Sequence, residues 1–316
     1  MTLDPQVATH LKRLAATGFA SMHTLQPEMV REGMRRMTQA LEPGEPVNQV
    51  DNRTISTDAG DLMIRIYHPV AGQARPVMVF FHGGGFVLGD LDSHDGLARS
   101  LALATECIVV SVDYPLSPEH KYPAARNAAY AATTWVAKHA EEIGGDPTRL
   151  VVAGDSAGGN LAAVVALMAR DSSGPEIAFQ LLIYPDLDFR RSNHSIHAFA
   201  GQYGNVGRET QSWFMDHYLN REEEKFDPLV SPLLAQDLAH LPPALVVTAE
   251  YDALRDEGEA YGLRLQQAGV NAVVKRYDGM IHEFLRWPFD ASRGALLDIG
   301  NAVQDGSRRR RAARLT

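Results

Sequence analysis

Short runs of Val, Ile, Leu and Phe recur from about residue 50 onward and alternate with segments of helical spacing. These runs occupy residues 62–67, 76–81, 108–112, 150–153, 179–184, 244–248 and 272–277. A strand that is apolar on both faces is buried on both faces, and strands that alternate with helices form mostly parallel sheets. The sequence therefore predicts an α/β fold in which helices cover both faces of the sheet.

Two segments lie outside this alternation: one precedes it and the other interrupts it. The first fifty residues contain one helical segment that opens at Asp4-Pro5 and a second near Pro27. Residues 186–227 show no strand pattern and one helical stretch at about 209–219. Apolar side chains of these segments are candidates for the roof of a pocket, namely Met29, Met34, Met37, Trp213, Phe214 and Met215.

Charge and hydropathy limit the possible functions. The chain of 316 residues has a formal net charge of −9, which argues against nucleic-acid binding. No stretch approaches the roughly 20 apolar residues of a membrane helix, and the first residues show no signal-peptide pattern. The single cysteine, Cys107, cannot form an internal disulfide, so we expect a cytoplasmic protein. A monomer and a homodimer both remain open.

The last residues carry a cluster of positive charge. Four consecutive arginines occupy positions 308–311 within the segment 306–316. Such a cluster can bind polyanions, but a solvated terminus is the more common situation. We expect a disordered tail and assign it no function.

The sequence Gly154-Asp155-Ser156-Ala157-Gly158 directly follows one predicted strand and precedes a stretch of small, helix-forming residues. This G-x-S-x-G pattern is typical of a nucleophilic serine on a sharp strand-to-helix turn, where the neighbours must be small. A glycine-rich turn without a catalytic role also matches the bare pattern. The strand before it and the helix after it favour Ser156 as a nucleophile.

The sequence His82-Gly83-Gly84-Gly85 directly follows the predicted strand at 76–81. Glycines after a strand let backbone N–H groups point at a developing oxyanion without obstruction by side chains. A phosphate-binding loop is the competing interpretation, but such loops continue with Lys and Ser or Thr. The next residues, Phe86-Val87-Leu88, supply neither, so we expect an oxyanion loop.

A catalytic serine needs a histidine that takes its proton and a carboxylate that orients this histidine. After such an elbow the order along the chain is Ser, then Asp or Glu, then His. Asp252 and His282 follow the last two predicted strands in this order, at the carboxyl ends where ligands bind. Rivals for the acid are Glu250, Asp256 and, less suitably because it is close to His282, Asp278.

Five motifs together resemble the hormone-sensitive lipase family, the microbial carboxylesterases with an HGGG oxyanion loop and a GDSAGG elbow. The resemblance spans about residues 3–303. The motifs are His82-Gly83-Gly84-Gly85, Asp113-Tyr114-Pro115-Leu116-Ser117-Pro118-Glu119-His120, Gly154-Asp155-Ser156-Ala157-Gly158-Gly159-Asn160-Leu161, Tyr251-Asp252-Ala253-Leu254-Arg255-Asp256-Glu257-Gly258 and Asp278-Gly279-Met280-Ile281-His282.

This resemblance implies an α/β-hydrolase fold, with a mostly parallel eight-stranded sheet between helices and a helical cap. The cap would comprise residues 1–48 and 186–227, and the catalytic core residues 49–185 and 228–305. The resemblance also implies a serine carboxylesterase. Such an enzyme hydrolyses small esters with short to medium acyl chains through an acyl-enzyme intermediate, without a cofactor or metal.

The site residues carry over by position. Ser156 is then the nucleophile, Asp252 the triad acid and His282 the general base. The oxyanion donors would be the N–H groups of Gly84, Gly85 and Ala157, with Gly83 supporting the turn.

Three positions depart from the family pattern, and none carries a reacting atom. Pro115 replaces a usual Arg, Ala253 a usual Pro, and Glu283 a common Gly. A non-catalytic small-molecule receptor on the same fold is the alternative from another class, but such receptors lose the histidine that is present here as His282. An amidase or a dehydratase would use nearly the same residues, and the sequence does not separate them from an esterase.

Overall fold

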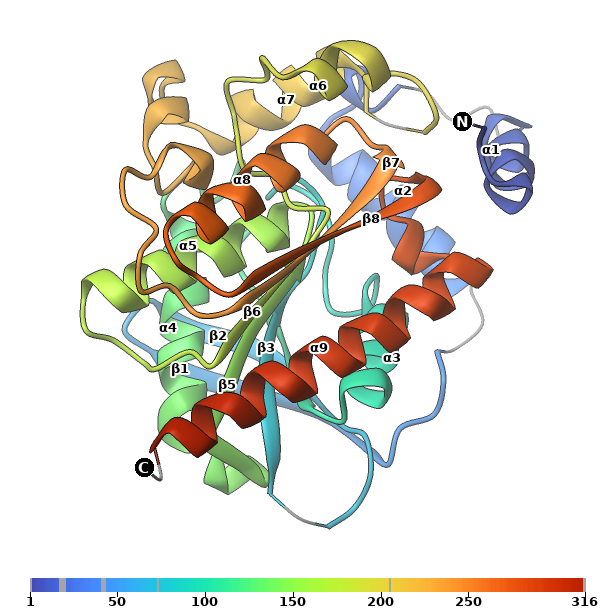
Figure 1. The fold of residues 1–316 in the computed structure, drawn as a ribbon. Coiled ribbons are helices and arrows are strands. Elements are labelled where there is room, and N and C mark those ends of the chain that lie inside the picture. The colour runs from blue at the N-terminus through green and yellow to red at the C-terminus, as the bar shows by residue number, and fades with distance from the viewer. Residues whose placement is uncertain (1, 17–20, 41–43, 73, 205, 315–316) are drawn as a thin grey trace.

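The computed structural model describes residues 2–16, 21–40, 44–72, 74–204 and 206–314. Its centre is an eight-stranded sheet in the order β1-β2-β4-β3-β5-β6-β7-β8, drawn in Figure 1. The pairs β1–β2 and β2–β4 are antiparallel, and all other pairs are parallel. The strands are β1 (Gln49–Thr57), β2 (Gly60–His68), β3 (Arg75–Phe81), β4 (Ile108–Asp113), β5 (Gly145–Asp155), β6 (Phe179–Ile183), β7 (Ala244–Tyr251) and β8 (Ala272–Ile281).

Helices cover both faces of the sheet, as predicted. Alternate side chains of each central strand enter opposite cores, because successive residues of a strand point to opposite faces; on β3, Val77 and Val79 lie in one core and Met78 in the other. The first core is closed by α4 (Ala124–His139), α5 (Ala157–Asp171) and α8 (Arg255–Gln267). The second is closed by α3 (Asp95–Thr105) and α9 (Asp290–Arg314).

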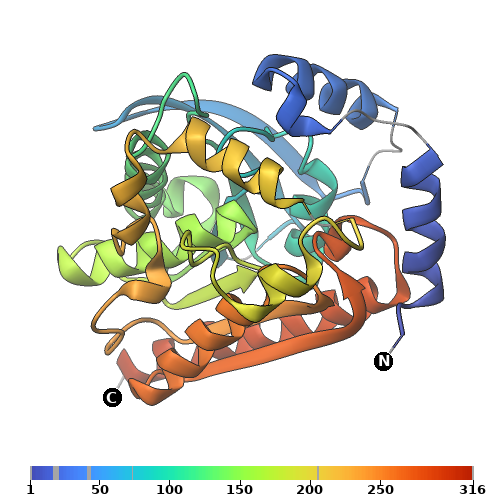
Figure 2. The ribbon, with the colours of Figure 1, turned by 90° about the horizontal axis from the view of Figure 1, so that it is seen from above.

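The remaining helices lie around the carboxyl ends of the strands or beside the sheet (Figure 2). They are α1 (Pro5–Ala16), α2 (Pro27–Gln39), α6 (His194–Phe199) and α7 (Arg208–Tyr218). Helix α2 packs against α7 through Val30 and Trp213. Helix α1 contacts β8, and just before this helix the Asp4 amide donates to the Gly279 carbonyl. Short 3-10 turns lie at Met22–Thr24, Glu141–Ile143, Glu222–Phe226, Pro232–Leu234 and Phe284–Arg286.

Strand β1 has no counterpart among the seven runs that the sequence pattern identified. The reason is its place at the edge of the sheet, where Ile55 is the only one of its side chains that is buried. A strand with a single buried side chain produces no apolar run and no clear alternation. The other seven strands all coincide with predicted runs.

The basic segment 306–316 differs from the expected disordered tail. Helix α9 continues through Arg314, so the described part of this segment is helical. Ala295, Ile299 and Val303 recur every four residues and pack into the second core. The contact continues at Gly306, where an added Cβ would lie 2.3 Å from the ring of Phe179. Burial of the preceding turns thus holds the start of this segment in the helix.

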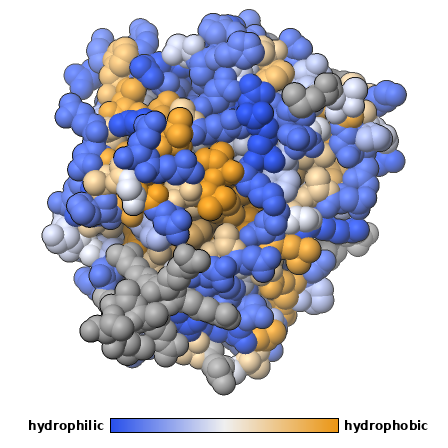
Figure 3. Space-filling view, in the orientation of Figure 1, coloured by the Kyte–Doolittle hydropathy of each residue, from blue (hydrophilic) through white to orange (hydrophobic). Residues whose placement is uncertain are grey.

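Strand β8 forms one edge of the sheet and is only partly covered. The face seen in Figure 1 carries β8 and α9, and Figure 3 shows hydrophobic residues gathered near its middle. Exposed apolar side chains on these two elements include Val273 and Leu297. Within the described ranges, no helix is long and apolar enough to cross a membrane.

Candidate active site

Ser156 lies on a sharp turn between β5 and α5, with φ +55° and ψ −117°. Such a left-handed conformation is strained for a residue with a side chain, and it persists only where the surroundings enforce it. Two glycines allow the turn to pack. A Cβ added at Gly158 would lie 1.8 Å from the Phe81 carbonyl oxygen, and one at Gly154 would lie 2.1 Å from the Gly158 oxygen. The turn therefore has the geometry that the G-x-S-x-G pattern predicts.

The structure brings Ser156, Asp252 and His282 together. Nε2 of His282 lies 3.0 Å from Oγ of Ser156, and its Nδ1 lies 2.8 Å from Oδ2 of Asp252. The other carboxylate oxygen of Asp252 accepts the Leu254 N–H at 2.8 Å. Asp252 is fully buried, whereas the His282 side chain remains 18% exposed. The acid is thus fixed, and the imidazole can reach a substrate.

The rivals for the acid role have other partners. Oε2 of Glu250 accepts the Gly279 N–H at 2.8 Å, and Oδ2 of Asp256 accepts the Ser195 N–H at 2.8 Å. Asp278 is exposed. Within the described residues, none of these three carboxylates bonds to His282. The geometry therefore favours Asp252.

The charges around His282 favour its protonated form. Burial alone would lower the pKa of His282, but the charge of Asp252 and the hydrogen bond to it outweigh burial and raise that pKa to about 9. The negative charge of Glu283 raises the pKa of His282 further. An imidazole with a raised pKa is a stronger base for the serine proton, but a smaller fraction of it is neutral at pH 7.

The glycine loop after β3 places two amides beside the serine turn. Gly84 and Gly85 have φ values of +119° and +63°, which glycine adopts without strain. Within the described part of the chain, neither amide has a protein acceptor. The Gly83 amide instead donates to Oδ1 of Asp155 at 2.9 Å, which ties the loop to the serine turn. The loop therefore presents free donors from Gly84 and Gly85, with Gly83 in a supporting contact.

Asp155 is the second residue of the G-x-S-x-G motif, a position to which the pattern assigns no function. Its carboxylate is fully buried, and Oδ2 lies 3.5 Å from Nε2 of the buried His94. Burial would raise the pKa of Asp155, but the contact with His94 and the positive charge of Arg286 together outweigh it and lower that pKa, so the carboxylate stays ionised. A charged acceptor forms a stronger bond to the Gly83 amide than a neutral one. The pairing with His94 could not be found from sequence because it joins distant segments.

The six apolar side chains proposed as a roof lie in different surroundings. Met34 packs beside Val87 and Leu88, and Met215 packs against the first core. Met29 and Met37 are 61% and 41% exposed, so they point to solvent and do not cover a pocket. Phe214 lies against the glycine loop, since a Cβ added at Gly85 would be 2.4 Å from Cδ1 of its ring. Trp213 is buried beside it. The wall that borders the expected donors therefore comes from α7.

Glu283 shows why glycine would suit its position. Its φ of +61° is left-handed, the region that favours glycine. Burial would raise the pKa of Glu283, but Arg286 and then His282 outweigh it and lower that pKa. An oxygen of Glu283 lies 3.1 Å from Arg286, whose guanidinium also donates to the Ser93 carbonyl. A charged side chain thus stands beside the base where the family often has none.

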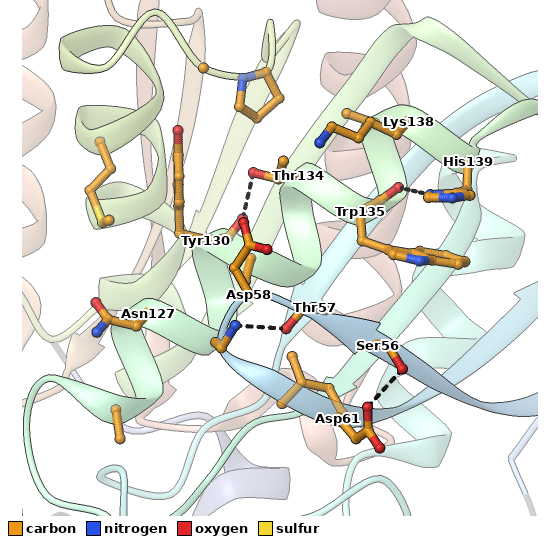
Figure 4. Close-up of a pocket in the computed structure, with 18 of the residues that line it drawn as sticks. Ser56, Thr57, Asp58, Asp61, Asn127, Tyr130, Thr134, Trp135, Lys138 and His139 are labelled. Atoms are coloured by element: carbon orange, nitrogen blue, oxygen red, sulfur yellow. Dashed lines mark hydrogen bonds between the residues drawn. The ribbon is translucent and has the colours of Figure 1, made fainter.

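A groove lies apart from these residues (Figure 4). It has a volume of about 1100 Å³ and lies between the β1–β2 hairpin and α4. Tyr130 and Trp135 line it together with Pro115, and none of Ser156, Asp252 and His282 does. Among the described residues, no three His, Cys, Asp or Glu side chains are grouped so that they could hold a metal ion. The serine turn therefore remains the centre of the candidate site.

Comparison with known proteins agrees with this geometry. A family model described as the α/β-hydrolase fold matches residues 78–286. Carboxylic ester hydrolase LipN of Mycobacterium tuberculosis is 40% identical over 293 residues, covering 90% of this chain and 77% of that protein. An ethyl acetate hydrolase of Pseudomonas putida is 33% identical over 298 residues, covering 90% and 93%.

A solved structure extends the likeness to three dimensions. The hyperthermophilic esterase of the archaeon Pyrobaculum calidifontis superimposes with a TM-score of 0.92 at 40% identity, over 96% of this chain and 99% of that one. The sheet order, the serine turn and these relatives lead to one assignment. The chain belongs to the α/β-hydrolase fold family and, within it, to the esterases of the hormone-sensitive lipase type.

Proposed function

We propose that the chain is a serine carboxylesterase that hydrolyses esters with short to medium acyl chains through an acyl-enzyme intermediate. In this proposal Ser156 is the nucleophile, His282 the general base and Asp252 the acid that orients it. The observation that carries it is the continuous contact from Asp252 through His282 to Ser156, with 2.8 Å and 3.0 Å between the bonded atoms.

The chemistry follows from these positions. Nε2 of His282 takes the Ser156 proton as Oγ bonds to the ester carbonyl carbon, and the carbonyl oxygen becomes an oxyanion. Amides of Gly84, Gly85 and Ala157 stabilise this charge. The imidazolium then protonates the leaving alcohol, and a water molecule, activated by the same histidine, cleaves the acyl-enzyme.

The size of the acyl group is inferred from the wall beside the donors. Phe214 borders Gly85, so a group that extends from the reacting carbonyl on that side soon meets an aromatic ring. One relative is named for the hydrolysis of ethyl acetate, a two-carbon acyl ester. In our proposal residues 1–48 and 186–227 form a cap that closes the pocket over the core at 49–185 and 228–305.

A receptor without catalysis is not favoured, because such a protein would have no need of a histidine that contacts both a buried carboxylate and a serine.

The cytoplasm is the compartment that we propose. Cys107 is a free cysteine, as is usual for proteins of that compartment. Burial raises the pKa of its thiol to about 12, so the thiol stays protonated and unreactive. Cell fractionation tests this placement.

Hydrolysis of p-nitrophenyl esters from acetyl to palmitoyl tests the function. We expect kcat/KM to rise towards butanoyl or hexanoyl and then to fall, because each buried CH₂ contributes about 0.8 kcal/mol until the chain meets the wall. The substitution Ser156→Ala should lower kcat by about 10³-fold or more while the protein stays folded. Turnover of the variant close to that of the wild type, or hydrolysis of amides in preference to esters, would contradict the proposal.

A further inference from the structure

Arg31 on helix α2 connects three parts of the chain through one guanidinium group. Its Nε donates to the Val87 carbonyl at 2.8 Å, and its Nη2 donates to the Ser117 carbonyl at 2.7 Å. Nη1 and Nη2 also donate to the two carboxylate oxygens of Glu119, each at 2.8 Å. The Arg31 side chain is only 13% exposed. A forked, partly buried contact of this kind fixes geometry as well as charge.

The two carbonyls that Arg31 holds belong to the support of the oxyanion loop. The amides of Val87 and Leu88 donate to the Gly84 carbonyl at 3.2 Å and 2.8 Å, so Val87 is part of the turn that contains Gly84. The Ser117 amide donates to the Phe86 carbonyl at 2.9 Å. Arg31 therefore supports the turn after Gly85 at two carbonyls, directly at that of Val87 and through Ser117 at that of Phe86.

Packing around α2 reinforces the same connection. Val30, the neighbour of Arg31, is buried with Val87 and Leu88 of the loop and with Trp213 of α7. The hydrogen bonds from Arg31 lower the pKa of Glu119 to about 2, so the ion pair persists at any pH at which the enzyme works. Position 115, where the family usually has Arg, is a proline in this chain. The guanidinium that contacts Glu119 comes instead from Arg31 on α2.

We propose that Arg31 is a positioning residue, which makes the placement of the Gly84 and Gly85 amides depend on the docking of helix α2. This inference rests on the proposed function, in which these two amides bind the oxyanion. It gives α2 a part in catalysis beyond covering the site: when α2 is docked the donors are aligned. When the guanidinium is lost, the Val87 carbonyl loses this partner, and the loop keeps its contact with Asp155 and the hydrogen bond from Ser117 to Phe86.

The substitutions Arg31→Met and Arg31→Lys test this role in the full chain, with Arg35→Met as the matched control. Arg35 lies on the same helix and pairs with Glu28 and Glu32, and among the described residues it has no contact with the glycine loop. The readouts are kcat and KM for p-nitrophenyl butanoate and the inhibition constant of an alkyl trifluoromethyl ketone. The ketone adds the serine reversibly and places a negative oxygen in the oxyanion site, so its affinity reports on the donors.

For Arg31→Met we expect kcat to fall roughly 10- to 100-fold with KM nearly unchanged, somewhat less than the loss of a whole oxyanion donor. Affinity for the trifluoromethyl ketone should fall by a similar factor. Arg31→Lys keeps the charge but loses the fork, so an intermediate loss is expected, and Arg35→Met should match the wild type in both readouts.

Unchanged kcat and ketone affinity in Arg31→Met would overturn the proposal, as would a loss of kcat with undiminished ketone affinity. If the methionine variant does not fold, Arg31→Lys decides, and wild-type values there overturn the proposal as well. Failure of the proposed function looks different, because a wild-type enzyme that hydrolyses no ester and does not bind the ketone would contradict the assignment of the site itself.

Discussion

The two halves of the candidate site are held in different ways. Ser156, Asp252 and His282 all follow strands of one sheet, and their contacts are made within the core. The glycine loop also follows a strand, but its outer side is held by Arg31 of α2 and bordered by Phe214 of α7. The sheet therefore fixes the proposed reacting groups, whereas the proposed oxyanion donors and the substrate wall depend on helices outside it. Changes to the first half, or to the placement of the donors, should affect the rate for every substrate, whereas changes to the wall should depend on the substrate.

The largest effect is expected in the core half. Asp252→Asn should lower kcat by about 10⁴-fold, the scale of the equivalent change in a protease triad, because an amide stabilises the wrong tautomer of His282. Glu250→Gln is the control. It removes the charge of a neighbouring carboxylate that bonds to the Gly279 amide and not to His282. Kinetics on a short and a medium ester should show the same factor, and a larger loss in the control would exchange the roles of the two carboxylates.

A smaller and selective effect is expected at the cap-facing wall. Phe214→Ala removes the ring that lies against Gly85 and leaves room for a longer chain. At about 0.8 kcal/mol per buried CH₂, two further methylenes correspond to roughly a 10-fold gain in kcat/KM for the longer ester relative to acetyl. The ratio of octanoyl to acetyl hydrolysis measures it. A ratio that does not move would mean that Phe214 is packing alone and that the wall lies elsewhere.

The smallest effect concerns pH. In the proposed mechanism His282 acts as a base only when it is neutral. Its negative neighbours favour the protonated form, so its pKa is raised to about 9 from the ordinary 6.5. We expect kcat/KM to rise with pH along a titration displaced above 6.5 towards that value. Glu283→Gln removes one of these charges and should move the midpoint down, with Arg293→Gln, an exposed pair partner of Asp290, as a control. A midpoint that is unchanged in Glu283→Gln would show that Glu283 does not contribute to the raised pKa of His282.

The same division separates what the sequence could predict from what it could not. Buried strands, the serine turn and the order of acid and base are local patterns, because each depends on a few adjacent residues. Strand β1 was missed since only Ile55 of its side chains is buried. The helical end of α9 was missed because a run of arginines resembles a solvated tail, although the preceding turns are buried.

Contacts between distant segments had no signal at all in a single sequence. Arg31 meets Val87 across 56 positions, and its helix otherwise has the appearance of an ordinary charged amphipathic segment. Of the methionines of that helix, which were candidates for contact with a pocket, Met29 and Met37 are exposed, whereas Met34 packs beside Val87 and Leu88. What apolar periodicity cannot give is the side of a helix that meets a particular loop, because this depends on how the whole helix docks.

Covalent labelling tests most directly the claim that the core half carries the chemistry. A p-nitrophenyl alkylphosphonate reacts with an activated serine, and mass spectrometry of the digested protein then locates the phosphonyl group. We expect a single label on Ser156, appearing in step with the loss of esterase activity, and a much slower reaction in His282→Gln. A label on another residue, or full activity after Ser156 is completely labelled, would contradict the account.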